Sequence, residues 1–210
     1  MATLRTITDF KSKLAGGGAR PNLFEVEVTF PQDLNIQWTQ GMQEKFQFLC
    51  KAASLPASIV APIDIPFRGR ILKVAGDRTF DTWTTTIIND EDFQLRTAFE
   101  EWMNGISKLD NNTGATRPIS YMANAVVNQL GRGGEGGRES TIQSTGTTVT
   151  PLRTYFFDGV FPTNVSPIDL SYDSSDAIEE FTVEFQVQYW MAGRGSESGT
   201  GSDQTSRIIS

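Results

Sequence analysis

The chain has 210 residues, a length that fits one large domain or two small ones. It contains no histidine, which excludes histidine-based catalytic triads and removes the commonest zinc ligand. Its single cysteine, Cys50, cannot form an intrachain disulfide. The formal net charge of -7 argues against a chain that holds nucleic acid by bulk electrostatic attraction. Composition therefore disfavours most enzymes.

Charge is distributed unevenly along the chain. No lysine or arginine occurs between Thr154 and Gly193, a stretch that contains several acidic residues. We interpret this stretch as a solvated acidic surface that keeps the protein soluble. No apolar run approaches the roughly 20 residues of a membrane span, and the N-terminus lacks the apolar core of a signal peptide. We therefore expect a protein that is made in a cytoplasm and has no membrane partner.

The first predicted element is a short amphipathic helix near the N-terminus. Four apolar residues recur there at helical spacing, and a run of three glycines at 16–18 ends the helix. The four apolar residues are Leu4, Ile7, Phe10 and Leu14. An apolar stripe is unusual on a monomer's surface, so the pattern indicates a contact surface.

Strands are predicted next. Residues 24–30 alternate between apolar and polar side chains, which places Glu25 and Glu27 on the polar face. Alternation also predicts a second strand over 46–50, and the polar segment 31–44 between the two strands is expected to be a long loop.

The following stretch predicts three more strands. Prolines interrupt the alternation of residues 63–67, which suits an edge strand. Residues 71–75 and 82–88 are predicted as two strands joined by a turn at Gly76, Asp77 and Arg78.

The apolar period then changes to that of a helix over residues 90–106. Asn89 or Asp90 is expected to cap its start. We expect this helix to cover one sheet face and to contribute mainly to stability. Its apolar stripe consists of Leu95, Phe99, Trp102, Met103 and Ile106.

The C-terminal half predicts four strands and a long glycine-rich loop at 131–150. The strands are expected at 119–130, 152–160, 167–172 and 180–190, and the last places Glu184 on a polar face. Together these elements predict a mainly β fold, an antiparallel sandwich or barrel with one flanking helix and a short N-terminal helix.

No motif in the chain predicts catalysis, a cofactor or a metal. Residues 131–136 match a GxGxxG pattern, but no helical stripe follows, so a flexible loop is the better interpretation. Asp90, Glu91 and Asp92 point in different directions on a helix and are interpreted as capping residues. The acidic group at 173–180 lacks the spacing of a calcium loop and is interpreted as a turn.

Several short segments, in one order along the chain, resemble the tail tube protein family of contractile-tailed phages of the T-even type. The most specific string is Val-Ala-Gly-Asp-Arg-Thr-Phe-Asp at 74–81. The other matching segments are 19–24, 50–52, 55–57, 89–91, 162–165, 173–174, 180–181 and 189–190, together with Trp83.

This resemblance implies a structural virion protein and not an enzyme. Members of this family form hexameric rings that stack into the inner tail tube, through which the genome passes at infection. The implied partners are further copies of the chain, the sheath, the baseplate hub, the tail terminator, and the tape-measure protein and then DNA inside the tube, with no sequence-specific binding. The implied location is the virion tail, assembled in the host cytoplasm.

Within such a tube two sets of residues gain candidate roles. Glu25, Glu27 and Glu184 are candidates for the lumen, where carboxylates would repel phosphate and keep DNA from adhering. Glutamates facing bulk solvent outside the tube are the alternative. Ring-to-ring contact is expected from Leu4, Ile7, Phe10 and Leu14 together with the 131–150 loop.

The expected organisation is a single tail-tube domain over residues 1–192. It has an N-terminal arm (1–18) and long loops (31–44 and 131–150), and a flexible tail (193–210) follows it. Two other functions remain open: a tube-forming secreted protein of a type VI-like contractile injection system, and a nucleic-acid-binding β-barrel. The barrel would need a basic groove, for which only Arg68, Arg70, Lys73 and Arg78 form a notable cluster.

Overall fold

The structure, a computed structural model, describes most of the chain. It covers residues 6–14, 18–34, 36–131, 142–143, 146–147, 151–173 and 176–194. Leu4, most of the 131–150 segment and nearly all of the 193–210 segment lie outside these residues. The described residues divide into two units, one within Met1–Glu25, Val127–Tyr155 and Ala192–Ser210, the other within Val26–Val126 and Phe156–Met191.

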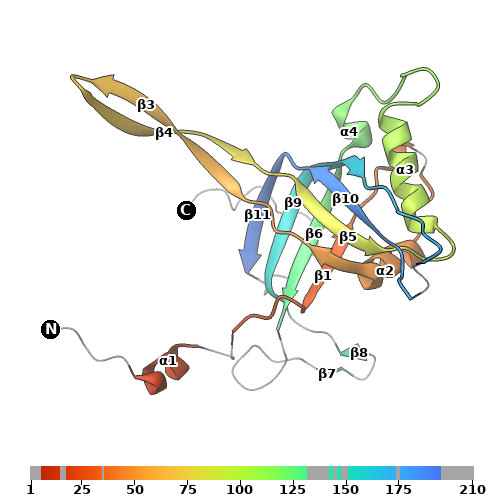
Figure 1. Cartoon of the computed structure of the whole chain (residues 1–210), viewed down its shortest axis with the longest axis horizontal. Helices are drawn as coiled ribbons and strands as arrows, with labels where there is room; N and C mark the ends of the chain where they lie inside the picture. Colours follow the sequence, from red (N-terminus) through yellow and green to blue (C-terminus); the bar gives the residue numbers. More distant parts are fainter. Residues whose placement is uncertain are drawn as a thin grey trace. The chain divides into compact units, whose positions relative to one another are not determined.

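Strands dominate the described residues, which confirms the expected mainly β fold with antiparallel pairing and a flanking helix (Figure 1). The helices are α1 (Ile7–Lys13), the 3-10 helix η2 (Gln32–Leu34), α2 (Gln40–Leu49), α3 (Gln94–Ile106) and α4 (Pro118–Tyr121). The strands are β1 (Phe24–Val28), β2 (Cys50–Ala53), β3 (Ser58–Phe67), β4 (Arg70–Phe80), β5 (Trp83–Ile88), β6 (Ala123–Leu130), β7 (Ile142–Gln143), β8 (Gly146–Thr147), β9 (Pro151–Val165), β10 (Glu180–Gln186) and β11 (Tyr189–Arg194). The main sheet has the order β1-β6-β9-β10-β5-β2, and β11 pairs with β9.

The first unit contains α1, which is the amphipathic helix expected near the N-terminus. A capping box starts it: Asp9 N donates to Thr6 Oγ1, and Thr6 N donates to the Asp9 carboxylate. In the same unit the Gln129 amide donates to the backbone carbonyls of Arg20 and Leu23. These bonds tie the chain that follows α1 to β6.

In the second unit β10 lies between β5 and β9, and both pairings are antiparallel. Alternation decides which side chains are buried: Phe181, Val183 and Phe185 are buried, and the polar residues between them are not. β5 has the same burial pattern, with Trp83, Thr85 and Ile87 buried, so the two strands present one buried and largely apolar face together. This face is where the core of the unit forms.

Helices α2 and α3 close that core with aromatic side chains. Phe99 of α3 is fully buried, and its ring centroid lies 5.9 Å from that of Phe185 and 6.5 Å from that of Phe181. Trp102 donates its indole N–H to the Tyr121 carbonyl at 2.8 Å, so its one polar atom is satisfied. The rings that complete the cluster are Phe30, Trp38 and Phe46. The expectation that this helix covers a sheet face is therefore confirmed.

Strands β3 and β4 form a separate two-stranded hairpin that projects away from the sheet of the second unit (Figure 1). A register shift lies between Val60 and Pro62, opposite Gly76. A Cβ added at Gly76 would come within 2.6 Å of the Ala61 carbonyl oxygen, so this bulge needs glycine. The turn predicted at Gly76, Asp77 and Arg78 is therefore wrong, because β4 continues through these residues.

The strand predicted over 46–50 is also wrong. Residues 40–49 form α2, whose start is capped by Thr39 Oγ1 accepting from Met42 N. Phe46 is fully buried whereas Phe48 is 86% exposed, because residues two apart lie on nearly opposite sides of a helix. A three-residue alternation was too short to distinguish the two periods.

Further expectations fail locally. The segment 31–44, expected to be a long loop, contains η2 and the first residues of α2. The single strand expected over 180–190 is interrupted, because β10 ends at Gln186 and β11 begins at Tyr189. Residues 167–172 form no strand. The stretch predicted as one strand from 119 begins with α4, and β6 starts only at Ala123. The helix expected over 90–106 begins only at Gln94, and none of Asn89, Asp90, Glu91 and Asp92 caps it. Its N-cap is Phe93, in a left-handed conformation without a side-chain cap.

We predict that Phe99→Ala lowers the free energy of unfolding by roughly 3 to 5 kcal/mol, because it removes the ring at the centre of the aromatic cluster. Chemical denaturation of the monomer measures this change. The matched control is Phe48→Ala on α2, whose side chain is exposed and whose removal should change stability by less than about 0.5 kcal/mol. Equal effects of the two substitutions would contradict the assignment of the core.

Candidate assembly surfaces

The β3–β4 hairpin has one apolar face that nothing covers in the described residues. Cross-strand register pairs Ile63 with Val74 and Ile65 with Leu72, and paired residues project from the same face. We define the apolar hairpin face as Ile59, Ile63, Ile65, Phe67, Leu72 and Val74. These side chains are between 42% and 66% exposed. So large a group of exposed apolar side chains on one face marks an interaction surface.

The opposite face of the hairpin also has exposed apolar side chains, Val60 and Ile71, but it combines them with charged ones. It carries the ion pair between Lys73 Nζ and Asp64 Oδ1 at 2.8 Å, with Pro62 and Pro66 on either side of Asp64 along β3. Both charged side chains are at least half exposed, so the pair contributes little to stability. The two faces therefore differ in chemistry, and the apolar one is suited to burial against protein.

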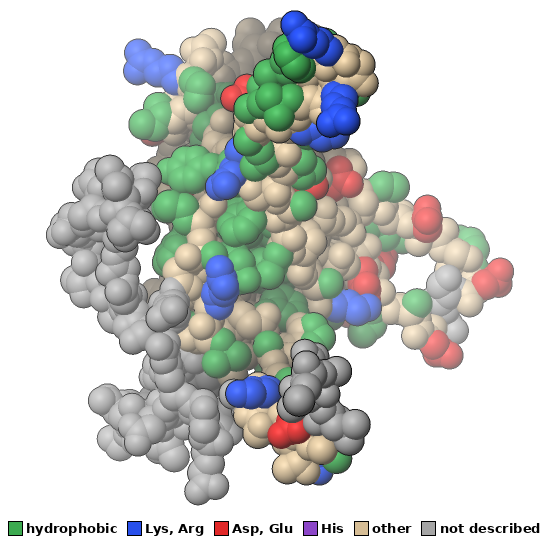
Figure 2. Space-filling view, turned by 90° about the vertical axis from the view of Figure 1, so that its left-hand side faces the viewer, with side chains coloured by type: hydrophobic (Ala, Val, Ile, Leu, Met, Phe, Trp, Pro, Cys, Tyr) green, Lys and Arg blue, Asp and Glu red, His purple; other side chains and the backbone are tan. Residues whose placement is uncertain are grey.

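The tip of the hairpin is basic. Arg68 and Gly69 form its two-residue turn with φ angles of 45° and 81°. The Arg68 guanidinium lies 5.4 Å from the centroid of the Phe67 ring. Figure 2 views the protein from the side toward which the hairpin projects, and blue and green side chains lie together near its top.

Helix α1 carries the second candidate surface. Ile7 is 74% exposed and Phe10 64% exposed, and Leu14 is exposed as well, so the predicted apolar stripe is uncovered in the structure. Leu4, the fourth residue of the stripe, lies outside the described residues. The hydrogen bonds from Thr6 lower the pKa of Asp9 and keep this helix start charged.

The three glutamates proposed for a lumen lie on strand positions that are not buried. Glu25 and Glu27 alternate with the buried Val26 on β1. Glu184 lies on β10, with Thr84 and Asn164 as its register partners. The strand order places β6 and β9 between β1 and β10, so Glu27 and Glu184 are not on neighbouring strands.

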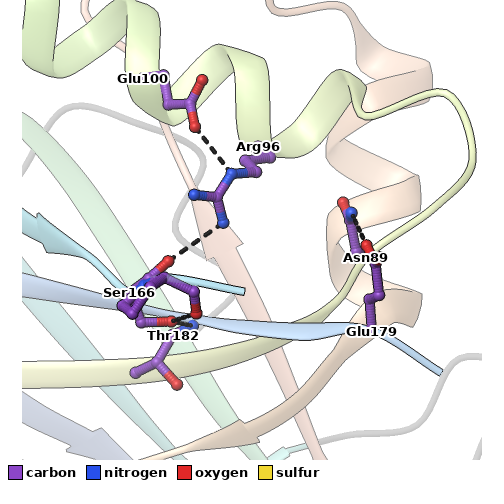
Figure 3. Close-up of polar contacts among 7 residues, drawn as sticks. Asn89, Arg96, Glu100, Ser166, Glu179 and Thr182 are labelled. Carbon is purple, nitrogen blue, oxygen red and sulfur yellow. Dashed lines mark hydrogen bonds and ion pairs between the residues drawn. The ribbon is translucent and has the colours of Figure 1, made fainter. Parts of the chain in front are cut away.

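A third exposed segment links β9 to β10, and polar contacts anchor both of its ends (Figure 3). At the first end Arg96 of α3 donates to the Ser166 carbonyl at 3.2 Å, and Ser166 Oγ accepts from Thr182 N at 2.8 Å. At the other end the Asn89 amide donates to Glu179 at 3.0 Å. The sequence predicted a turn for the acidic group at 173–180 and a strand over 167–172 that does not form, and it gave no signal for the anchors.

The remaining polar groups that the sequence singled out have structural roles. Asp90 and Asp92 form ion pairs with Lys45, and the contact with Lys45 holds the pKa of Asp90 below its ordinary value. Burial raises the pKa of the Cys50 thiol to about 12, so this thiol is not a nucleophile. Among the described residues, no group of acidic or cysteine side chains is placed to bind a metal ion, and no helix is long and apolar enough to cross a membrane.

The sequence also matches known proteins. Residues 19–193 match a family described as phage tail tube protein. Tail tube protein gp19 of Enterobacteria phage T4 is 35% identical over 176 residues, which cover 84% of this chain and 93% of gp19. The tail tube protein of Serratia phage KSP90 is 22% identical over 191 residues, 90% of this chain and 97% of that protein.

Solved structures share the fold at low sequence identity. A chain of the anti-feeding prophage baseplate has a TM-score of 0.59 at 14% identity and covers 86% of this chain and 98% of its own length. A chain of the PVC sheath-tube complex, an extracellular contractile injection system, has a TM-score of 0.52 at 12% identity, with 91% and 99% covered. The family match, the identity to gp19 and the shared fold confirm the resemblance found in the short motifs. The chain therefore belongs to the phage tail tube protein family, and it is a structural protein of the virion tail and not an enzyme.

Proposed function

We propose that this protein forms hexameric rings that stack into the inner tube of a contractile tail, and that the tube is the conduit for phage DNA during ejection. Membership of the tail tube family supports this function, and the observation that carries it is the uncovered apolar hairpin face. Completing the burial of a half-exposed aliphatic or aromatic side chain stabilises by roughly 1 kcal/mol. The six side chains of this face therefore offer several kcal/mol per subunit for association.

The hairpin also gains from a partner. An isolated two-stranded hairpin is only marginally stable in water, because it has no second layer to bury its side chains. In this chain the hairpin is anchored at its base, where Phe80 contacts Trp190 edge to face at 6.3 Å. A second copy of the chain can supply this missing layer, because copies of the chain are concentrated wherever the tube grows.

A tube of this kind meets other proteins on its outside, at its ends and in its lumen. Chains of similar fold come from a baseplate, a sheath-tube complex and a tube-terminating cap. We infer the corresponding partners here: the sheath around the tube, the baseplate hub below and the terminator above. Inside it are the tape-measure protein and then DNA, held without sequence-specific binding.

We also propose that residues 1–192 form a single tail-tube domain, with an N-terminal arm at 1–18 and a long loop at 131–150. Residues 193–210 then form a tail outside the domain. The family match supports this division, since it begins at residue 19, directly after the arm, and ends at residue 193.

Two other functions make different predictions. A nucleic-acid-binding barrel would bind single-stranded DNA as an isolated protein, with affinity that falls as salt rises. A tube-forming protein of a type VI-like secretion system would lie among genes for secretion-membrane proteins, not among sheath and capsid genes. The 35% identity to gp19 of phage T4 favours the phage tail.

Replacing the cross-strand pair Ile65→Ser and Leu72→Ser should abolish rings and tubes, as seen by negative-stain electron microscopy. Both side chains are exposed in the monomer, so its free energy of unfolding should change by less than about 0.5 kcal/mol. The matched control is the adjacent pair on the opposite face, Asp64→Ser with Lys73→Ser, which should assemble normally. Tubes of normal yield from the Ile65 and Leu72 variant would refute the role of the apolar hairpin face.

Deleting residues 1–15 should leave a folded protein that forms rings but does not elongate, because the arm would supply ring-to-ring contacts. The double variant Ile7→Ser and Phe10→Ser should reproduce this defect if the apolar stripe is responsible, whereas Lys11→Ser with Lys13→Ser should elongate normally. Tube length distributions measured by electron microscopy report the outcome. Parental tube lengths from the deletion would show that the arm has another role.

The triple substitution Glu25→Lys, Glu27→Lys and Glu184→Lys should slow DNA ejection from assembled particles, since cations in the lumen would pair with phosphates. The matched Glu→Gln triple variant removes the repulsion without adding attraction and should slow ejection less. Ejection is timed by fluorescence of a DNA dye in the medium. Lysine-substituted tubes that are intact and eject as fast as the parent would place these residues outside the lumen.

A further inference from the structure

The hairpin tip combines two cations with two exposed apolar side chains. Phe67 is 66% exposed and Ile71 63% exposed, and Arg68 and Arg70 lie between them along the chain. Within the described part of the chain, neither guanidinium forms an ion pair. We define these four residues as the basic tip. A surface of this composition fits a partner that offers both carboxylates and apolar contact.

The backbone at Arg68 argues that its side chain serves a purpose. Its φ of 45° lies in the left-handed region, where asparagine or glycine is favoured and arginine is rare. A turn of two residues with positive φ angles needs no cation for its own folding. Arginine at this strained position therefore points to a contact made by the guanidinium.

The complementary surface lies on the segment between β9 and β10. We define the acidic segment as residues 166–173 and 176–179, whose two ends are anchored by Arg96 and Asn89 as described above. It has no lysine or arginine. Exposed carboxylates and exposed apolar or aromatic side chains occur together along it: Asp169, Leu170, Tyr172, Asp173, Asp176 and Ile178. Tyr172 is fully exposed, and Leu170 is 81% exposed.

The basic tip and the acidic segment belong to the same unit but cannot meet within one chain. Figure 1 draws the tip at the far end of the projecting hairpin, whereas the segment between β9 and β10 runs on the other side of the sheet, beside α3. A contact between them must therefore join two copies. Such a contact uses two different surfaces of the chain, so it is heterologous and propagates into a closed ring or a helical assembly.

We propose that the basic tip of one subunit docks on the acidic segment of a second copy of this chain. Arg68 and Arg70 form charge-assisted hydrogen bonds to Asp169 and Asp173, and Phe67, which shares a hairpin face with its register partner Arg70, buries Leu170 and Tyr172. Both ends of the acidic segment are anchored before the tip arrives. Docking therefore costs less conformational entropy than it would with a free loop. This inference rests on the proposed function and adds the identity of the two surfaces that meet.

The test is charge reversal with rescue in the full-length chain. Arg68→Glu with Arg70→Glu should raise the critical concentration for assembly at least about ten-fold, and Asp169→Lys with Asp173→Lys should do the same, since each places like charges at the contact. The variant with all four substitutions restores opposite charges between neighbours and should assemble within about three-fold of the parent. Sedimentation and electron microscopy measure assembly.

Two controls separate the possible failures. Lys108→Glu with Arg117→Glu reverses two exposed cations elsewhere and should assemble like the parent. Arg68→Asn with Arg70→Gln keeps the turn favourable while removing both charges, and it should weaken assembly less than reversal does.

The assembly results distinguish failure of the proposed contact from failure of the proposed function. Normal assembly of the tip reversal variant overturns the inference, and so does a four-residue variant as defective as the single-surface variants. If the parent and the Lys108 and Arg117 control form no rings or tubes under any condition, it is the proposed function that fails. Tubes from the parent, loss on each reversal and recovery in the four-residue variant support the assigned contact.

Discussion

Phe99 is completely buried, and its ring centroid lies between 5.3 and 6.5 Å from those of five other aromatic residues. These rings come from the segment after β1, the segment before α2, α2 itself and β10, so one side chain joins elements far apart in the sequence. Packing at this density fixes the position of α3 on the sheet. Because Arg96 on α3 holds Ser166, the cluster also fixes the segment between β9 and β10.

The hairpin has the opposite character. Every residue of β3 is exposed, and the hairpin gives the sheet of the second unit no buried side chains from this strand. The chain therefore keeps a well-packed core beside an arm whose apolar face is unused in the monomer. Such an arrangement separates folding from association: changes on the apolar hairpin face alter assembly without altering the stability of the subunit.

The parts of the fold that sequence predicted are those with long, regular patterns. Alternation over β10 and the helical stripe of α3 identified elements that the core then buries on the expected faces. Prediction failed where a pattern was short or a local signal was ambiguous. Phe46 and Phe48 suggested a strand within what is a capped helix, and Gly76 indicated a turn although it forms a bulge, because glycine permits both.

The same distinction applies to the candidate surfaces. The exposure of Ile7 and Phe10 followed from their helical spacing and the glycines behind them. The sequence did not predict the apolar hairpin face, because the register between β3 and β4 decides which side chains share that face. The turn predicted at 76–78 also lies within β4, so the two strands of the hairpin were not paired correctly. The anchors of the acidic segment depend on contacts such as Asn89 with Glu179, which are 90 positions apart and leave no local trace in the sequence.

The bulge at Gly76 has a consequence for the geometry of any closed assembly. An extra residue in one strand bends a hairpin and increases its twist, so the direction in which this arm leaves its own sheet depends on a position where only hydrogen fits beside the Ala61 carbonyl. In a circle of identical subunits, an angular error at one contact is repeated at every contact and accumulates around the circumference. Gly76 therefore influences the curvature of the tube wall and the diameter of the lumen, although its backbone makes none of the contacts proposed between subunits.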